Sequence, residues 1–315
     1  MNIAFYGRLE PIDNHEYLIN ILLKDYSNII CDYLPINSIP NKEYNIVVYS
    51  CREPDSNMHW GKSPSYIQVE NFVKLAKPKI IVQLSEECAS EHLEIHNLLS
   101  NYCNLLLRHH RHGSQLYTYN SRVEAIPLGY LNGFKYFVDI KEPSSRKYNW
   151  AWCGHLKNDR VEMIHHFWRI WSNIVVTSAN LPTSEVSDIY SNSIFVPCGR
   201  GNFSLDCWRI YEAIVSGAIP VVVGSEQEII DTFTFFEELP PFIFSDNWSN
   251  AVSYCQSIQS NADELLSHQT KVIDWWNRTI TKIQARIKIA LESEYTPLPL
   301  EAFEKLVKIP RYKSL

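Results

Sequence analysis

The stretch that decides the fold is Phe195–Gly224, which reads FVPCGRGNFSLDCWRIYEAIVSGAIPVVVG. It opens on a short apolar run, passes through a glycine-containing loop, continues as a helical pattern and ends in a second apolar run. Gly199 and Gly201 allow the backbone of the loop to approach a ligand closely. Gly217 is a natural end for the helix, and Ile219–Val223 is apolar enough for a strand buried on both faces. The stretch therefore predicts a strand, loop, helix and strand of a parallel α/β sheet.

The loop and the first helical turn have the composition of an anion site. Ser204 or Asp206 is predicted to cap the helix, which leaves free N–H groups at its start. A helix N-terminus attracts an anion such as a pyrophosphate, and Arg200 adds a cation beside it. Arg209 and Glu212 are three residues apart on one helix face, from which the carboxylate can accept two ribose hydroxyls. The alternative is that Arg209 and Glu212 only pair with each other across one turn.

The same alternation of apolar runs and amphipathic segments extends over the whole chain, as in βα units around parallel sheets. In the first half we predict strands at Asn2–Tyr6, Ile29–Tyr33, Tyr44–Tyr49, Lys79–Leu84, Leu105–Arg108 and Ala125–Ile126, and helices at His15–Lys24, Tyr66–Ala76 and Ser90–Leu99. In the second half we predict strands at Tyr148–Cys153, Ile174–Thr177, Ile194–Pro197, Ile219–Val223 and Phe242–Phe244. The helices between and after them are predicted at Arg160–Trp171, Thr183–Ser191, Asp206–Ser216, Gln227–Phe233, Trp248–Gln259 and Ala262–Leu291, with a last short one near Leu300–Val307.

Two successive α/β domains follow from this pattern. Pro127–Gly133 interrupts the alternation, and the polar segment Lys141–Lys147 is predicted to be the linker. We therefore expect one Rossmann-like domain over residues 1–140 and a second over residues 146–294, with residues 295–315 able to pack back on the first. Because ligands bind outside the carboxyl ends of the strands in doubly wound sheets, the site is expected to face an interdomain cleft.

Composition excludes several classes of function. The net charge of −6 argues against broad nucleic-acid binding, although the basic cluster Arg108–His112 is suited to a phosphate or an anionic membrane surface. The eight cysteines contain no CxxC pair, so no zinc site is predicted and a reducing compartment is expected. With neither a signal peptide nor a run of 18 apolar residues, the sequence predicts a cytoplasmic protein that can still contact the inner face of a membrane peripherally.

The central stretch resembles the signature of exostosin-type glycosyltransferases and the related ribitol xylosyltransferase group. The matching residues follow in the same order: Arg200-Gly201, Ser204, Arg209, Glu212-Ala213 and Gly217-x-x-Pro220-Val221-Val222. Three further segments agree: Leu84-Ser85-Glu86-Glu87, Leu107-Arg108 followed by Ile126-Pro127-Leu128-Gly129-Tyr130, and Trp150–His155 followed by Arg160. The first of them departs from the family, which usually has Asp where Glu86 stands.

The resemblance implies a GT-B fold and transfer of a sugar from a nucleotide-sugar, a UDP-sugar in these relatives, to an acceptor hydroxyl. The first domain would then face the acceptor and the second would bind the donor, with no cofactor and no essential metal. By this resemblance, Arg160 and Arg200 are expected to contact the phosphates and Glu212 to hold the ribose. Arg209 is expected to support either the phosphate contacts or the ribose contact. The donor-binding set expected from the motifs comprises Gly154, Arg160, Arg200, Gly201, Asn202, Ser204, Asp206, Arg209 and Glu212.

A glycosyl transfer also needs a base that deprotonates the acceptor. We expect it from the first domain, with Glu87 and Glu86 as the leading candidates because they follow a predicted strand at its carboxyl end. His109, His15 and Asp13 are weaker candidates. For the two glutamates, the alternative role is to stabilise the dipole of a helix N-terminus.

The resemblance further implies inversion at the anomeric carbon by a hexosyl- or pentosyltransferase. Its acceptor would be a glycan or lipid-linked glycan in surface polysaccharide or lipopolysaccharide synthesis. Two other readings of the sequence stay open. One is a GT-B-like nucleotide-sugar epimerase that needs no acceptor, and the other is a non-catalytic bilobed binding protein.

Overall fold

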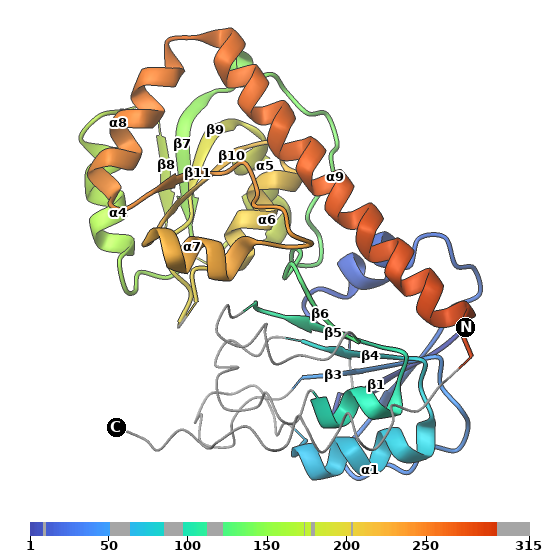
Figure 1. Cartoon of the computed structure of the whole chain (residues 1–315). Helices are drawn as coiled ribbons and strands as arrows, with labels where there is room; N and C mark the ends of the chain where they lie inside the picture. Colours follow the sequence, from blue (N-terminus) through green and yellow to red (C-terminus); the bar gives the residue numbers. More distant parts are fainter. Residues whose placement is uncertain are drawn as a thin grey trace. The chain divides into compact units, whose positions relative to one another are not determined.

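The computed structural model describes residues 1–8, 11–50, 64–84, 97–111, 122–172, 174–177, 180–202 and 204–294. The chain divides into two compact units, each built on one sheet of parallel strands (Figure 1). Unit 1 comprises Met1–Pro11, Asp25–Ile126 and the chain from Gln284 onwards, and unit 2 comprises Ile12–Lys24 and Pro127–Ile283.

The sheet of unit 1 has the strand order β2-β1-β3-β4-β5-β6. Its strands are β1 Asn2–Tyr6, β2 Ile30–Leu34, β3 Ile46–Tyr49, β4 Ile80–Gln83, β5 Leu105–His109 and β6 Val123–Ile126. The four central strands are almost wholly buried, as their continuous apolar runs predict. Helix α1, Tyr66–Ala76, begins at a capping box made by Ser65 and Gln68 and buries Phe72 and Val73 in the core of this unit.

The sheet of unit 2 has the order β11-β10-β9-β7-β8. Its strands are β7 Tyr148–Cys153, β8 Ile174–Thr177, β9 Ser193–Pro197, β10 Ile219–Val223 and β11 Ile243–Ser245. The helices are α4 Arg160–Trp168, α5 Thr183–Ser191, α6 Trp208–Val215, α7 Glu226–Phe233, α8 Trp248–Gln259 and α9 Ala262–Glu292, and the part of α9 from Gln284 onwards belongs to unit 1. Helices α4 and α8 lie side by side on one flank of this sheet (Figure 1). The core beneath them contains Trp150, Phe167 and Trp248.

The strand order of unit 2 marks where a ligand is expected. The chain enters at β7, adds β8 on one side, and then crosses back to place β9, β10 and β11 on the other side. The order therefore reverses between β7 and β9, and the loops that leave these two strands diverge at their carboxyl ends. In doubly wound sheets such a switch point is the usual ligand-binding crevice.

The predicted elements are confirmed with small shifts at their ends. β1, β7, β8, β10, α1, α5 and α8 have the predicted bounds. The segment His15–Lys24 was predicted to be a helix, and it contains a short π-helix over Tyr17–Leu22. Most of the predicted helix Ser90–Leu99, and all of residues 295–315, lie outside the described residues.

The predicted linker Lys141–Lys147 lies within unit 2, and the chain passes from unit 1 to unit 2 after Ile126. Arg146 accounts for this placement because its buried guanidinium donates to the carbonyls of Lys141, Tyr190, Ser193 and Ser216. Burial lowers the pKa of Arg146 to about 10. Arg146 therefore binds the polar run Lys141–Lys147 to the second sheet, and this run is not an exposed linker.

A segment from the first half of the sequence also belongs to unit 2. Asn132 donates from its backbone N–H to the carbonyl of Asp13 at 2.7 Å and from Nδ2 to the carbonyl of Ile12 at 2.7 Å, while its Oδ1 accepts from the N–H of Glu16 at 2.8 Å. Tyr17 packs on Gly129, where an added Cβ would come within 2.5 Å of the ring. The turn at Pro127–Gly133, which interrupts the sequence pattern, is therefore the anchor for Ile12–Lys24.

Candidate functional site

The switch point of unit 2 brings together the loops that leave β7 and β9. Gly154 follows β7, and Gly199, Arg200 and Gly201 follow β9. An added Cβ on Gly199 would lie 2.6 Å from Cγ of Arg160, so only glycine lets the second loop pass this close to α4. An added Cβ on Gly154 would lie 3.5 Å from Nε and from Nη2 of Arg209. Both loops therefore approach arginine side chains at this edge of the sheet.

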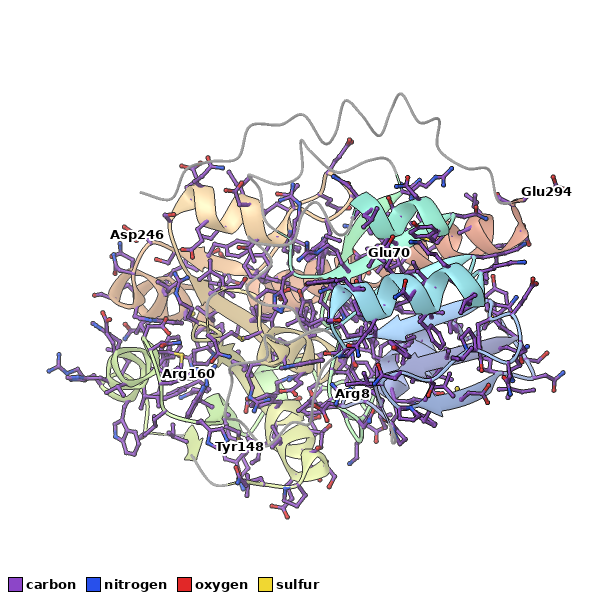
Figure 2. All side chains as sticks on the ribbon, turned by 90° about the horizontal axis from the view of Figure 1, so that it is seen from below. Arg8, Glu70, Tyr148, Arg160, Asp246 and Glu294 are labelled. Carbon is purple, nitrogen blue, oxygen red and sulfur yellow. The ribbon has the colours of Figure 1, made fainter. Side chains whose placement is uncertain are left out.

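Arg160, labelled in Figure 2, is the first residue of α4. Its exposed fraction is 8%. Its Nη1 donates to the carbonyl of His155 at 2.8 Å, and its Nη2 donates to the carbonyl of Arg200 at 3.0 Å. Its Nε has no hydrogen-bond partner within the described part of the chain. The guanidinium is thus fixed in orientation by two backbone carbonyls and keeps one buried donor for another acceptor.

Arg200 does not stand free in the loop. Its two terminal nitrogens donate to the two carboxylate oxygens of Glu228, with 2.9 Å between Nη2 and Oε2. The hydrogen bond to Glu228 raises the pKa of Arg200 above its ordinary value. Its backbone N–H donates to Oδ1 of Asp159 at 2.9 Å, and Oδ2 of Asp159 accepts from Nε1 of Trp248 at 3.1 Å. The predicted phosphate-binding residue is therefore held at its backbone and at its side chain.

Arg209 and Glu212 form the ion pair across one helical turn that the sequence left open as an alternative. Nη1 of Arg209 donates to Oε2 of Glu212, and Nε donates to the carbonyl of Cys153 at 2.7 Å. Glu212 is fully buried, and no hydrogen bond to its Oε1 is formed by the described residues. Burial raises the pKa of Glu212, and the charge and hydrogen bond of Arg209 and the nearby N–H of Leu131 oppose this rise. Since a quarter of the Arg209 side chain is exposed, the pair reaches solvent through the arginine.

Cys207 is the N-cap residue of α6, and the charges around its thiol change the pKa of that thiol. A hydrogen bond with Cys198 lowers the pKa of the Cys207 thiol, and burial opposes this effect. The charges of Arg160 and Arg209 lower this pKa further. Cations from two helices thus add to the dipole of α6, and the combination favours an anion at this point.

Four other predicted donor-site residues shape the β9–α6 loop in the structure. Oδ1 of Asn202 pairs with Nζ of Lys157, and the carbonyl of Gly201 accepts from Nδ2 of Asn158. Ser204 and Asp206 are both buried. The prediction that one of these two residues caps α6 is wrong, because the helix begins after Cys207. Oγ of Ser204 accepts from the N–H of Asp206, and Oδ1 of Asp206 accepts from the hydroxyl of Tyr211 at 2.7 Å.

The sequence analysis missed Glu228 and Asp159, which orient Arg200. Glu228 had a detectable signal: Ser225 and Glu228 have the spacing of a capping box, and Oγ of Ser225 accepts from the N–H of Glu228 at 3.3 Å. That spacing predicts the start of a helix but not a salt bridge to a residue 28 positions away. No comparable sequence pattern singles out Asp159.

The structure describes only some of the candidate bases. Glu86 and Glu87 lie outside the described residues. His109 ends β5 in unit 1 and is fully buried, and burial followed by the charge of Arg108 lowers its pKa to about 3. A ring with this pKa is a poor proton acceptor near neutral pH. His15 is half-buried in the segment that packs in unit 2, and burial lowers its pKa too.

The described ranges contain neither a metal-binding cluster nor a membrane-spanning helix. No three His, Cys, Asp or Glu side chains among these residues are grouped closely enough to hold a metal ion. No helix among them combines the length and the apolar character needed to cross a membrane.

Comparison with solved structures assigns the architecture. No protein-family model matches the sequence, and no curated protein sequence matches it either. An α-glucosyltransferase solved with UDP-glucose and DNA superimposes with a TM-score of 0.51 at 10% identity, over 98% of this chain and 99% of that one. The Anabaena protein HepE in complex with UDP superimposes with a TM-score of 0.53 at 11% identity, over 93% of this chain and all of HepE.

The chain has the GT-B fold. At about one residue in ten identical, these likenesses establish the fold alone. Within the GT-B fold, unit 2 supplies the switch point at β7 and β9 where Arg160, Arg200 and Arg209 lie.

Proposed function

We propose that this protein is a glycosyltransferase that moves a sugar from a nucleotide-sugar, a UDP-sugar, to an acceptor hydroxyl. The observation that carries the proposal is the position of Arg160 and Arg209 beside the start of α6, at the switch point of a GT-B sheet. There the charges of Arg160 and Arg209 both act on Cys207. The UDP and UDP-glucose bound by the structural neighbours supply the precedent for the donor class.

The leaving diphosphate is stabilised by Arg160, Arg200 and the N-terminus of α6. The unpaired Nε of Arg160 is the donor of this set that has no protein acceptor among the described residues. The ribose is held by Glu212. Its Oε1 accepts no hydrogen bond from the described residues, so it can accept one from a ribose hydroxyl. Such a hydroxyl would offset the cost of a buried carboxylate that is paired on one side.

In the transfer step, the acceptor hydroxyl loses its proton to a base while its oxygen attacks the anomeric carbon. The bond between that carbon and the phosphate oxygen breaks, and UDP leaves with the electron pair. We assign the base to Glu87 or Glu86, and the configuration at the anomeric carbon inverts. Product NMR that shows a retained configuration would remove this part of the proposal.

The arginines take the role that a cation has in other transferases, so turnover is proposed to need no metal. The acceptor is a glycan or lipid-linked glycan of a surface polysaccharide or lipopolysaccharide, and the transferred sugar is a hexose or a pentose. The protein would work in the cytoplasm, with peripheral contact to the inner face of the membrane.

A donor screen tests the proposal. Purified protein is incubated with UDP-, GDP- and CDP-sugars, with and without a mixture of glycan acceptors, and the products are followed by mass spectrometry. We expect a UDP-sugar to be consumed only when an acceptor is present, and Glu212→Ala to abolish this. Conversion of the donor without an acceptor would instead identify a nucleotide-sugar epimerase. Failure of every nucleotide to bind would identify a non-catalytic binding protein.

A further inference from the structure

The ion pair between Arg200 and Glu228 joins the loop after β9 to the first turn of α7. Both terminal nitrogens of the guanidinium donate to the carboxylate, one to each oxygen. About a third of each side chain is exposed, 31% for Arg200 and 33% for Glu228, so a ligand in solution can reach the pair. The pair is therefore neither a buried structural bridge nor a loose surface contact.

The backbones at both ends of this pair are fixed. The N–H of Arg200 is bonded to Asp159, and its carbonyl is bonded to Arg160. The N–H of Glu228 is capped by Ser225. An added Cβ on Gly224 would lie 3.2 Å from Oε2 of Glu228, so the glycine leaves room for the carboxylate. The guanidinium of Arg200 and the carboxylate of Glu228 can therefore exchange partners while both backbones stay in place.

The guanidinium of Arg200 suits two kinds of anion. Its planar fork binds a carboxylate and a phosphate with the same bidentate geometry. A diphosphate that arrives at the start of α6 therefore meets an arginine that is already neutralised by a carboxylate. The negative charge of Glu228 also opposes the approach of the phosphate over a distance of a few ångströms.

From this geometry we infer that Glu228 is an internal anion that competes with the donor diphosphate for Arg200. Glu228 holds the guanidinium in place when no donor is bound, gives it up when the diphosphate binds, and recaptures it when the nucleotide leaves. The residue thus lowers the affinity for the nucleotide and hastens its release. The inference rests on the proposed function in so far as the anion is a nucleotide diphosphate.

The test compares three proteins by calorimetry with two probes, UDP and inorganic pyrophosphate. Glu228→Gln removes the charge and keeps an oxygen that can accept from Arg200. We expect this variant to bind both probes about 10-fold more tightly than the unaltered protein. Glu226→Gln is the matched control, since Glu226 is an exposed carboxylate in the same first turn of α7. We expect this control to change the affinity less than about twofold.

A second comparison asks whether Glu228 acts through Arg200. In an Arg200→Met background, adding Glu228→Gln should tighten the binding of both probes by less than about twofold, the part that charge repulsion alone supplies. If Glu228→Gln tightens binding equally in that background, Glu228 acts by simple repulsion and the competition is refuted. Unchanged or weaker binding by Glu228→Gln alone also refutes it, because Glu228 would then only position the arginine.

The two probes separate this inference from the proposed function. If UDP binds to no variant, the proposed function fails, and the competition for Arg200 is decided by pyrophosphate alone. Thermal unfolding checks that each variant folds. If Glu228→Gln does not fold, Glu228→Asp replaces it, because the shorter side chain keeps the charge but loses the bidentate reach. That variant should bind pyrophosphate about threefold more tightly, and no change would count against the inference.

Discussion

Nη2 of Arg160 donates to the backbone carbonyl of Arg200 at 3.0 Å, so the two arginines predicted to meet the donor phosphates are bonded directly to each other. A second bond to the carbonyl of His155 leaves only Nε of Arg160 without a partner among the described residues. Because the side chain is buried, this orientation is set before any ligand arrives. Such pre-orientation lowers the entropic cost of binding an anion.

Removing the guanidinium of Arg160 should therefore weaken nucleotide binding strongly. For Arg160→Met we expect about 30- to 100-fold weaker binding of UDP, as for the loss of one or two charge-assisted hydrogen bonds. Arg169→Met is the control, because Arg169 is an exposed cation at the other end of the same helix. Calorimetry with UDP measures both. Equal losses in the two variants would show that only the overall charge of α4 matters.

The free energy of unfolding should depend on pH through the titration of Glu212. Burial raises the pKa of this carboxyl, so the folded state holds its proton more tightly than the unfolded state does. The contribution of Glu212 to the free energy of unfolding is then greatest in acid and falls as the pH rises from about 4.5 through the pKa of the folded state. Glu212→Gln removes this contribution.

Urea unfolding of both proteins between pH 4 and pH 8 measures the effect of Glu212→Gln. The stability of the variant relative to the unaltered protein should increase with pH across this range and then level off. A difference that is constant with pH would mean that the Arg209 charge compensates fully for burial.

His109 should produce the opposite dependence in acid. Its pKa of about 3 in the folded protein, against about 6.5 when exposed, means that the unfolded chain binds this proton more readily. The contribution of His109 is therefore complete above pH 6.5 and is lost as the pH falls towards 3, to a total of about 5 kcal/mol. His109→Gln should lose correspondingly less stability over this interval, as measured by urea unfolding. Parallel curves for the two proteins would contradict the assignment of a buried, neutral imidazole.

The close passage of the β9–α6 loop against α4 should be sensitive to a single methyl group. Gly199→Ala places a Cβ within 2.6 Å of Cγ of Arg160, which forces the loop or the arginine to shift. We expect a loss of about 1–3 kcal/mol in the free energy of unfolding, as for overpacking elsewhere. The double variant Gly199→Ala, Arg160→Ala should recover stability but not UDP binding. If the double variant is no more stable than Gly199→Ala, the contact with Arg160 is not the cause.

Turnover should continue when divalent metals are removed. In the proposed mechanism, the arginines and the start of α6 provide the positive charge that the leaving diphosphate needs. Initial rates in the presence of EDTA, compared with rates after addition of Mn²⁺ or Mg²⁺, measure this directly. A rate that falls to background in EDTA and returns with either ion would contradict this prediction.

The sequence predicted the strands because they depend on local patterns. β10 is a continuous apolar run and β7 is an aromatic-rich one interrupted only by Asn149, and both have the bounds that the sequence predicts. Gly217, with a positive φ of 70°, ends α6 as its position predicted. The wrong start of α6 has a local cause. The carboxylate of Asp206 bonds to the hydroxyl of Tyr211, a competing contact that the capping rule does not take into account.

The remaining features depend on contacts between residues far apart in the sequence. Asn132 bonds to Ile12 and Glu16 across more than a hundred residues, and this contact assigns an early segment to the second unit. The ion pair between Arg200 and Glu228 likewise joins the loop after β9 to the first turn of α7, 28 residues further along the chain. No periodicity or spacing signals such a distant partner, so the sequence predicted Arg200 as a site residue but not its pairing with Glu228.

The central claim is that unit 2 binds a nucleotide diphosphate at the start of α6. The most direct measurement is calorimetric titration of the full chain with UDP, GDP and CDP, followed by the same titration of Arg160→Met. We expect saturable binding of UDP at one site per chain, weakened about 30-fold or more in the variant. Absence of binding by all three nucleotides, or UDP binding that Arg160→Met leaves unchanged, would contradict it.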